Sequence, residues 1–235
     1  MIAKSIVFLL LYSIMINSAF SKNIDNQLLI NKLEERLNQR EDKLLKELFM
    51  QKSFNLFNKQ YLDFRKKYKT AKWSIQAIRH DQNKSFLDIK IISTRKINDQ
   101  IYDLHTKQTV KLETYKNKIK GYEVIDEESI LNNQKSPLII KIVSPNKVLT
   151  GEKYEMNLII DNPLDSSLTA SGMVLLKNEG NKKISNELFS IKPNQSGGLF
   201  KYIQAPLETG SQTISAIITH PEGIYLITKK INVGL

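Results

Sequence analysis

Cysteine is absent from this 235-residue sequence. Its absence excludes disulfide bonds, cysteine-based zinc sites, iron–sulfur clusters and thiol nucleophiles. Proline and glycine are scarce, at 6 and 9 residues, and they concentrate in the second half: Pro137 is the first proline, and Gly121 is the only glycine before residue 150. Without covalent cross-links, the fold must be stabilised by burial of apolar side chains.

Acidic residues are also in deficit. Lys and Arg number 35 against 24 Asp and Glu, a formal net charge of +11, while hydrophobic residues make up 41% of the chain. This composition is typical of a globular protein and is too rich in charge for a polytopic membrane protein. Long apolar runs are missing after the first twenty residues.

The first 21 residues have the three-part pattern of a secretory signal peptide. Lys4 gives a short positive region, Ile6–Ile16 is apolar, and Ser18–Ser21 supplies small residues for cleavage after Ser21. The apolar run is about half of the roughly 20 residues that a membrane-spanning helix needs. We therefore predict an exported protein, soluble after cleavage, in the periplasm or, in a photosynthetic bacterium, the thylakoid lumen.

A polar stretch that ends in a proline, Asn132–Pro137, predicts a boundary between two domains. The predicted organisation is a signal peptide at 1–21, a first domain at 24–134 and a second at 137–235. Each domain has about 100 residues, which is enough to bury a core of its own.

The first domain is predicted to be α+β, with helices packed on a curved antiparallel sheet. Leu29, Leu33 and Leu37 are spaced for one helical face, and a second helix is expected from Asp42 to about Thr70. That helix carries an aromatic stripe at spacings of three and four: Phe54, Phe57, Tyr61, Phe64 and Tyr68. Alternating apolar and polar residues then predict four antiparallel strands around 73–77, 87–91, 104–112 and 122–124.

The second domain is predicted to be an all-β, Ig-like sandwich. Seven short apolar segments separated by turn signals fit in about 100 residues, as such sandwiches require. They are 138–143, 154–160, 168–176, 188–191, 199–204, 213–219 and 224–233. The Cys–Trp–Cys pattern of antibody domains is absent, so the prediction concerns architecture alone.

Residues 56–131 resemble the nuclear transport factor 2-like superfamily, a cone-shaped α+β fold. The likeness is carried by Tyr61–Phe64 at the end of the aromatic helix, Ala71–Ile75 at the next strand and Glu123–Leu131 at the last one. The whole chain is also similar to uncharacterised, mainly cyanobacterial exported proteins that add a β-domain to this cone. The matching β-domain segments are Gly197–Lys201, Gln204–Pro206 and His220–Gly223.

The resemblance implies two classes of function. The leading expectation is an exported, non-enzymatic binding or scaffold protein that acts through protein–protein interaction, with homodimerisation through the sheet of the α+β domain. The alternative is a small-molecule-binding protein or a ketosteroid isomerase-like enzyme that uses the interior of the cone. No catalytic residue of those enzymes matches this sequence position by position, and no cofactor is predicted.

Asp103 and His105 are the candidate ligand site for that alternative. They are two residues apart in one predicted strand and therefore share a face. Lys107 and Lys111 continue the same face, which equally fits an exposed sheet surface.

Metal binding is not predicted. The three histidines, His80, His105 and His220, lie on separate elements without a paired-histidine motif. The acidic run Asp126–Glu128 lacks the spaced ligands of a calcium loop and is more typical of the end of a strand or helix.

A basic segment is the feature that departs most from the average. It holds seven cations and one anion, Asp63, over about 21 residues: Lys52, Lys59, Arg65, Lys66, Lys67, Lys69 and Lys72. Such a cluster attracts an anionic partner, either a protein or a lipid headgroup, although a solvated helix face has the same composition. Nucleic acid is not expected, because the chain is exported and carries no reading motif.

Overall fold

The structure is a computed structural model that describes residues 26–81, 83–133, 138–161, 169–179, 182–184, 192–194, 197–221 and 223–234. The predicted signal peptide, residues 134–137 of the predicted boundary Asn132–Pro137 and the predicted strand 188–191 lie outside these ranges, whereas Asn132 and Asn133 are described and end strand β4 (Lys118–Asn133). The division into two domains therefore stays a prediction. No helix among the described residues is long and apolar enough to cross a membrane.

Helices occupy the N-terminal end of the described chain. Residues 26–39 are helical, followed by α2 (Asp42–Glu47) and α3 (Gln51–Lys67). Leu29, Leu33 and Leu37 are all buried, which confirms the helical face predicted from their spacing. The single helix expected from 42 to about 70 is broken, because the backbones of Leu48 and Met50 hydrogen-bond to Ile119 instead.

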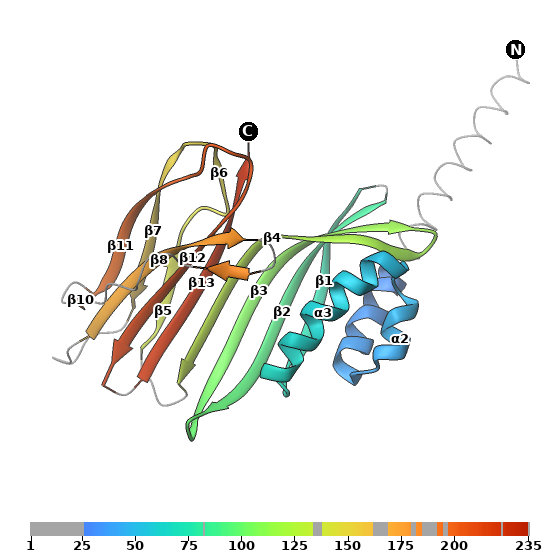
Figure 1. The fold of residues 1–235 in the computed structure, drawn as a ribbon, viewed down its shortest axis with the longest axis horizontal. Coiled ribbons are helices and arrows are strands. Elements are labelled where there is room, and N and C mark those ends of the chain that lie inside the picture. Colours follow the sequence, from blue (N-terminus) through green and yellow to red (C-terminus); the bar gives the residue numbers. More distant parts are fainter. Residues whose placement is uncertain are drawn as a thin grey trace, which may run out of the picture.

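Ten described strands form one large sheet in the order β1-β2-β3-β4-β13-β12-β8-β10, with β6 on β13 and β9 on β8 (Figure 1). Their bounds are β1 (Lys72–Asp81), β2 (Lys84–Ile97), β3 (Gln100–Tyr115), β4 (Lys118–Asn133), β6 (Lys147–Leu149), β8 (Thr169–Glu179), β9 (Lys182–Ile184), β10 (Lys192–Asn194), β12 (Gly210–His220) and β13 (Gly223–Gly234). A second sheet has the order β11-β7-β5, formed by β11 (Gly198–Gln204), β7 (Lys153–Ile160) and β5 (Ile140–Val143).

The large sheet runs through both halves of the chain because β4 pairs antiparallel with β13. Six residue pairs form this junction, from Tyr225 opposite Asn132 to Lys230 opposite Glu127. Lys229 reinforces it: its side chain is 4% exposed, and its Nζ lies 3.0 Å from Asp126 Oδ1 and 2.7 Å from Asn146 Oδ1.

Two hydrophobic clusters pack on opposite faces of this sheet. The first joins the helices to one face of β1–β4 and includes Leu33, Tyr61 and Leu87. The second joins β7 of the small sheet to the other face of β12 and β13, where Leu158 and Ile214 are fully buried. Figure 1 shows the helices over one end of the large sheet and the small sheet at the other end.

The predicted fold class is wrong. We expected an α+β domain, with helices packed on a curved sheet, followed by a separate Ig-like sandwich, but the protein is predominantly β, with few helices at one end. The local alternation of side chains predicted antiparallel strands correctly. It contained no information on the pairing of β4 with β13, which are about 90 residues apart in sequence.

The resemblance to the nuclear transport factor 2-like cone, and to exported proteins that append a β-domain to it, is wrong for the same reason. A cone would end its sheet within the first half, whereas here β4 is an interior strand of a sheet that continues through β13, β12 and β8. The segments that carried the likeness form an amphipathic helix and long antiparallel strands, elements that occur in many folds.

Candidate ligand-binding cavity

A cavity of about 610 Å³ lies between the helices and the face of the large sheet that they cover. Its sheet wall consists of alternate residues of β2, β3 and β4 and extends onto β13 through Leu226 and Thr228. Most lining side chains are aliphatic or aromatic. The aromatic ones are Phe49, Phe57, Tyr61, Phe64, Tyr68, Trp73 and Tyr122.

The aromatic side chains form a connected wall on the helix side. Phe57 stacks on Tyr61 with ring centroids 5.5 Å apart, and Tyr61 lies 6.0 Å from Trp73. The ring centroid of Phe64 lies 5.8 Å from that of Trp73 and 4.9 Å from that of Tyr68. Each such contact adds about 0.5–1.5 kcal/mol beyond area burial, so the rings stabilise one another without a ligand.

Arg65 fixes the C-terminal end of α3 over the sheet. Its guanidinium lies 4.3 Å from the centroid of the Trp73 ring, donates to the carbonyl of Ala71 at 3.1 Å and also donates to the carbonyl of Leu37. At the other end, the backbone of Met50 donates to the carbonyl of Ile119 at 2.9 Å. Both ends of the helix that roofs the cavity are thus anchored.

The outer edge of β1 is covered by side chains of the first helix. Asn38 accepts from the backbone N–H of Trp73 at 2.9 Å and donates to its carbonyl at 2.8 Å. Glu34 accepts from the backbone N–H of Ile75 at 2.7 Å. These bonds satisfy polar groups that an edge strand otherwise exposes, and they fix Trp73 in the cavity wall.

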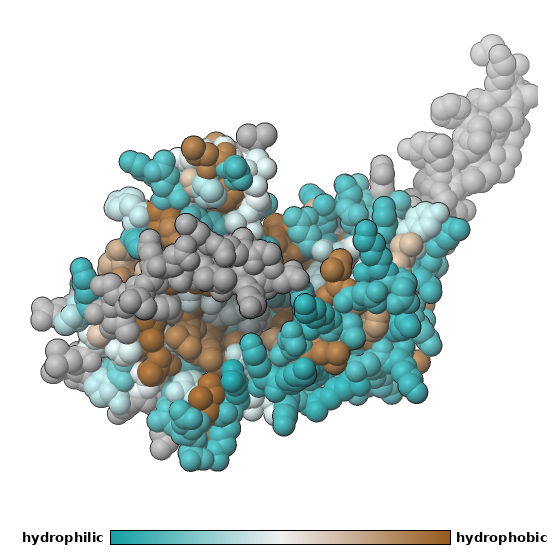
Figure 2. Space-filling view, viewed as in Figure 1, coloured by the Kyte–Doolittle hydropathy of each residue, from teal (hydrophilic) through white to brown (hydrophobic). Residues whose placement is uncertain are grey.

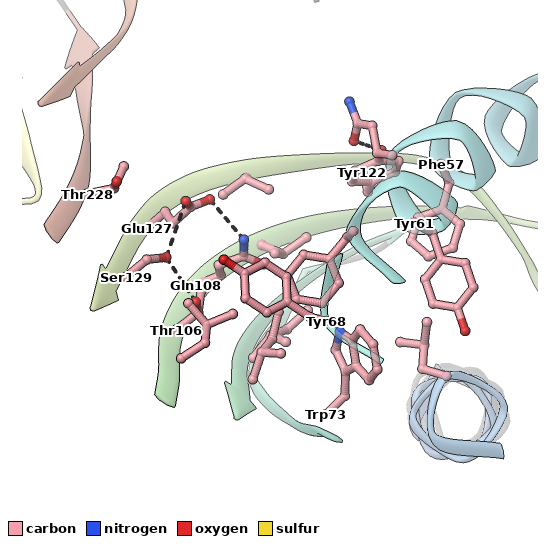
Figure 3. Close-up of a pocket in the computed structure, with 18 of the residues that line it drawn as sticks. Phe57, Tyr61, Tyr68, Trp73, Thr106, Gln108, Tyr122, Glu127, Ser129 and Thr228 are labelled. Carbon is pink, nitrogen blue, oxygen red and sulfur yellow. Dashed lines mark hydrogen bonds between the residues drawn. The ribbon is translucent and has the colours of Figure 1, made fainter. Parts of the chain in front are cut away.

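Opposite the aromatic wall, four polar side chains of β3 and β4 form a connected cluster (Figure 3). Gln108 Nε2 donates to Glu127 Oε2 at 2.9 Å, and the hydroxyls of Thr106 and Ser129 lie 2.9 Å apart. Ser129 also donates to Glu127 Oε1 at 3.5 Å, a long contact. Figure 3 shows the Tyr68 ring projecting from the end of α3 toward this cluster.

Strand register brings these four residues together. Thr106 is directly opposite Ser129, and Gln108 is directly opposite Glu127. Because directly opposite residues of an antiparallel pair point to the same face, all four face the cavity. We name Thr106, Gln108, Glu127 and Ser129 the polar cluster.

Tyr122 and Gln60 supply a second polar contact under α3, where the Tyr122 hydroxyl donates to Gln60 Oε1 at 2.6 Å. Burial raises the pKa of Tyr122 above its ordinary value of 10. The hydroxyl therefore keeps its proton at physiological pH and remains a hydrogen-bond donor.

Asp103 and His105 lie outside the cavity. They alternate along β3 with Leu104 and Thr106, which line it, so their side chains occupy the opposite face of the sheet. His105 is exposed there, next to Lys107 on the same face. The structure therefore does not bring this pair to the aromatic wall or to the polar cluster.

The basic segment divides into two kinds of residue. Arg65 is half-buried and holds α3 in place, so it is a structural residue. Lys52, Lys59, Lys66, Lys67, Lys69 and Lys72 are exposed. Lys66 lies 3.9 Å from Asp63 in a solvent-exposed pair. Figure 2 shows that the end of the molecule built by the helices is mainly hydrophilic on the face in view.

Sequence reasoning missed the polar cluster. The spacing of Leu104, Val110 and Leu112 predicts one buried face for the strand around 104–112, but it does not single out Thr106 and Gln108, the two polar residues between them on that face. Polar residues that interrupt an apolar face on two adjacent strands were the available signal. Within the described residues, no group of three or more His, Asp or Glu side chains is placed to hold a metal ion.

Comparisons with known proteins concern parts of the chain. Residues 135–234, less than half of it, match a family described as "Domain of unknown function (DUF8623)". No curated protein matches at a significant level. Among solved structures, the chain is similar to a chitin-binding domain from Burkholderia pseudomallei, with 10% identity and a TM-score of 0.29, over 38% of this chain and 57% of that one. So low a similarity establishes neither a shared fold nor a shared ligand.

Proposed function

We propose that this protein is a non-enzymatic binding protein that holds one predominantly apolar small molecule between α3 and the large sheet. The observation that carries the proposal is the cavity of about 610 Å³ lined by seven aromatic side chains and a few polar groups, the polar cluster among them. Ligand sites of proteins span roughly 300–1,000 Å³ and combine apolar walls with a few placed polar groups.

The composition of the lining supports binding rather than catalysis. Its described residues include no histidine, lysine or arginine, and Glu127 is their only carboxylate. General acid–base catalysis needs a group placed to give a proton and another placed to take one. Here the polar groups hydrogen-bond to one another along the sheet, an arrangement that orients a ligand without an evident proton donor–acceptor pair.

The single tryptophan provides the test, because Trp73 lies in the cavity wall. Titration of the protein with N-phenyl-1-naphthylamine, an uncharged aromatic probe, is expected to quench Trp73 fluorescence and to saturate at one probe per chain. Thr106→Phe fills the cavity and should abolish saturable binding. Thr109→Phe makes the same change on the opposite face of β3 and should leave binding intact. Equal effects of the two variants would refute the proposal.

We propose export as the setting of this function, based on the signal-peptide pattern of residues 1–21. The periplasm and the thylakoid lumen are the compartments consistent with that pattern. N-terminal sequencing of the mature chain from an expressing cell tests it, with cleavage after Ser21 as the expected result.

Protein partners remain a second proposal. The six exposed lysines of the basic segment favour an anionic protein or lipid surface, since α3 carries four of them and Lys69 and Lys72 follow it closely in the chain. The face of β3 that carries Asp103 and His105 is the proposed surface for self-association, which analytical ultracentrifugation tests.

A further inference from the structure

The charge of the cavity is opposite in sign to that of the whole protein. The chain carries a formal net charge of +11, yet Glu127 is the only charged residue among the described residues that line the cavity. An anionic ligand group would meet a carboxylate there and no lining cation with which to pair.

The hydrogen-bonding capacity of the polar cluster points the same way. A carboxylate accepts about four hydrogen bonds. Glu127 receives one good bond from Gln108 and one long bond from Ser129 within the cluster. These described bonds leave about half of that acceptor capacity for a ligand, and Figure 3 shows the Tyr68 ring beside the cluster. The cluster therefore offers a ligand more acceptor than donor capacity.

Besides Arg65, which stacks on Trp73 and is held by the carbonyls of Leu37 and Ala71, two cations lie near the cavity but outside its lining. Lys230 is directly opposite Glu127 in the ladder between β13 and β4, and its ammonium donates to the carbonyl of Val124. The guanidinium of Arg95 lies 5.7 Å from the centroid of the Tyr68 ring. Both are engaged with other groups of the protein, which leaves Glu127 as the charge that a bound molecule meets first.

We infer that the cavity selects amphiphiles whose head group donates hydrogen bonds and carries positive charge, with Glu127 as the specificity-determining residue. The inference rests on the proposed function and adds the class of ligand. The apolar body lies against the aromatic wall under α3, and the protonated amine pairs with the Glu127 carboxylate. Gln108 and Ser129 are positioning residues that orient this carboxylate. Charge-assisted hydrogen bonds are about twice as strong as neutral ones, so the head group has a strong influence on affinity.

Three probes of equal chain length test the inference at pH 7: dodecylamine and dodecanoate, each below its micelle concentration, and dodecanol, below its solubility limit. Each competes with bound N-phenyl-1-naphthylamine, and Kd is measured for each. We expect dodecylamine to bind about tenfold or more tightly than dodecanoate. Glu127→Gln should weaken dodecylamine about tenfold or more and should change dodecanol less than about threefold, because only the amine loses an ion pair.

Glu123→Gln is the matched control, since it removes one carboxylate of the same strand outside the cavity. Two results overturn the inference on the head group while the cavity remains a binding site. In the first, Glu127→Gln and Glu123→Gln change the Kd of dodecylamine equally. In the second, dodecanoate binds most tightly of the three probes, and Thr106→Phe abolishes its binding. If N-phenyl-1-naphthylamine itself does not bind, the proposed function fails first, and the inference with it.

Discussion

Replacement of Lys229 by methionine is the sharpest test of how the two halves of the chain are joined. The side chain of Lys229, a residue of β13, is 4% exposed. Its ammonium contacts Asp126 Oδ1 on β4 at 3.0 Å, Glu128 Oε2 at 3.9 Å and Asn146 Oδ1 at 2.7 Å. Methionine keeps most of the apolar volume but removes the charge.

Loss of one partner of a buried ion pair typically costs about 3–5 kcal/mol, because the other charge stays buried without compensation. The side chains of Asp126 and Glu128 are 16% and 29% exposed, so water partly solvates the carboxylates that lose their partner. We therefore expect the lower end of that range, a loss of about 3 kcal/mol in the free energy of unfolding. When Asp126→Asn is combined with Lys229→Met, the free energy of unfolding should rise again by about 1 kcal/mol or more, because the effects of substitutions at contacting residues are not additive.

Urea denaturation measures this loss, followed by Trp73 fluorescence for the first half and by far-ultraviolet circular dichroism for the whole chain. Lys141→Met is the control, because Lys141 is exposed on β5 and the same substitution there should change stability by less than about 0.5 kcal/mol. A loss below about 1 kcal/mol for Lys229→Met, or one equal to that of the control, would show that the junction does not depend on this ion pair.

Three further predictions concern the roof of the cavity, the core and the surface. Arg65→Ala should lower the free energy of unfolding by about 2 kcal/mol and shift the fluorescence emission of Trp73, because it removes the guanidinium stacked on Trp73 and two hydrogen bonds to backbone carbonyls. An unchanged emission spectrum would contradict this prediction. Burial raises the pKa of Tyr154 to about 12. Between pH 10 and pH 12 this tyrosine therefore ionises in the unfolded chain but not in the folded one, and the free energy of unfolding should fall. The fall should be smaller in Tyr154→Phe, and identical pH profiles of the two proteins would contradict the prediction. Replacing Lys59, Lys66 and Lys67 by Gln should reduce the retention of the protein on anionic liposomes, and salt should reduce it as well. Retention that does not depend on salt would contradict an electrostatic binding surface.

Local sequence patterns predicted individual elements well where a single face is buried. The aromatic stripe of α3 lines the cavity or joins the first hydrophobic cluster, as its spacing indicated. The turns at Asn98–Asp99 and Lys116–Asn117 have positive φ angles at both residues, as the tight two-residue connections of hairpins require. These features depend on neighbours a few residues away, so periodicity suffices to find them.

The sequence by itself indicated which apolar face is buried in the helices and in several strands, because alternation and helical spacing sort apolar from polar residues within one element. Only the tertiary structure decided that β4 pairs with β13 and that Thr106 and Gln108 lie opposite Ser129 and Glu127. Pairing between distant strands depends on register and on the burial of both faces of the sheet, and no local pattern specifies either. The cavity and its single charge are consequences of that pairing.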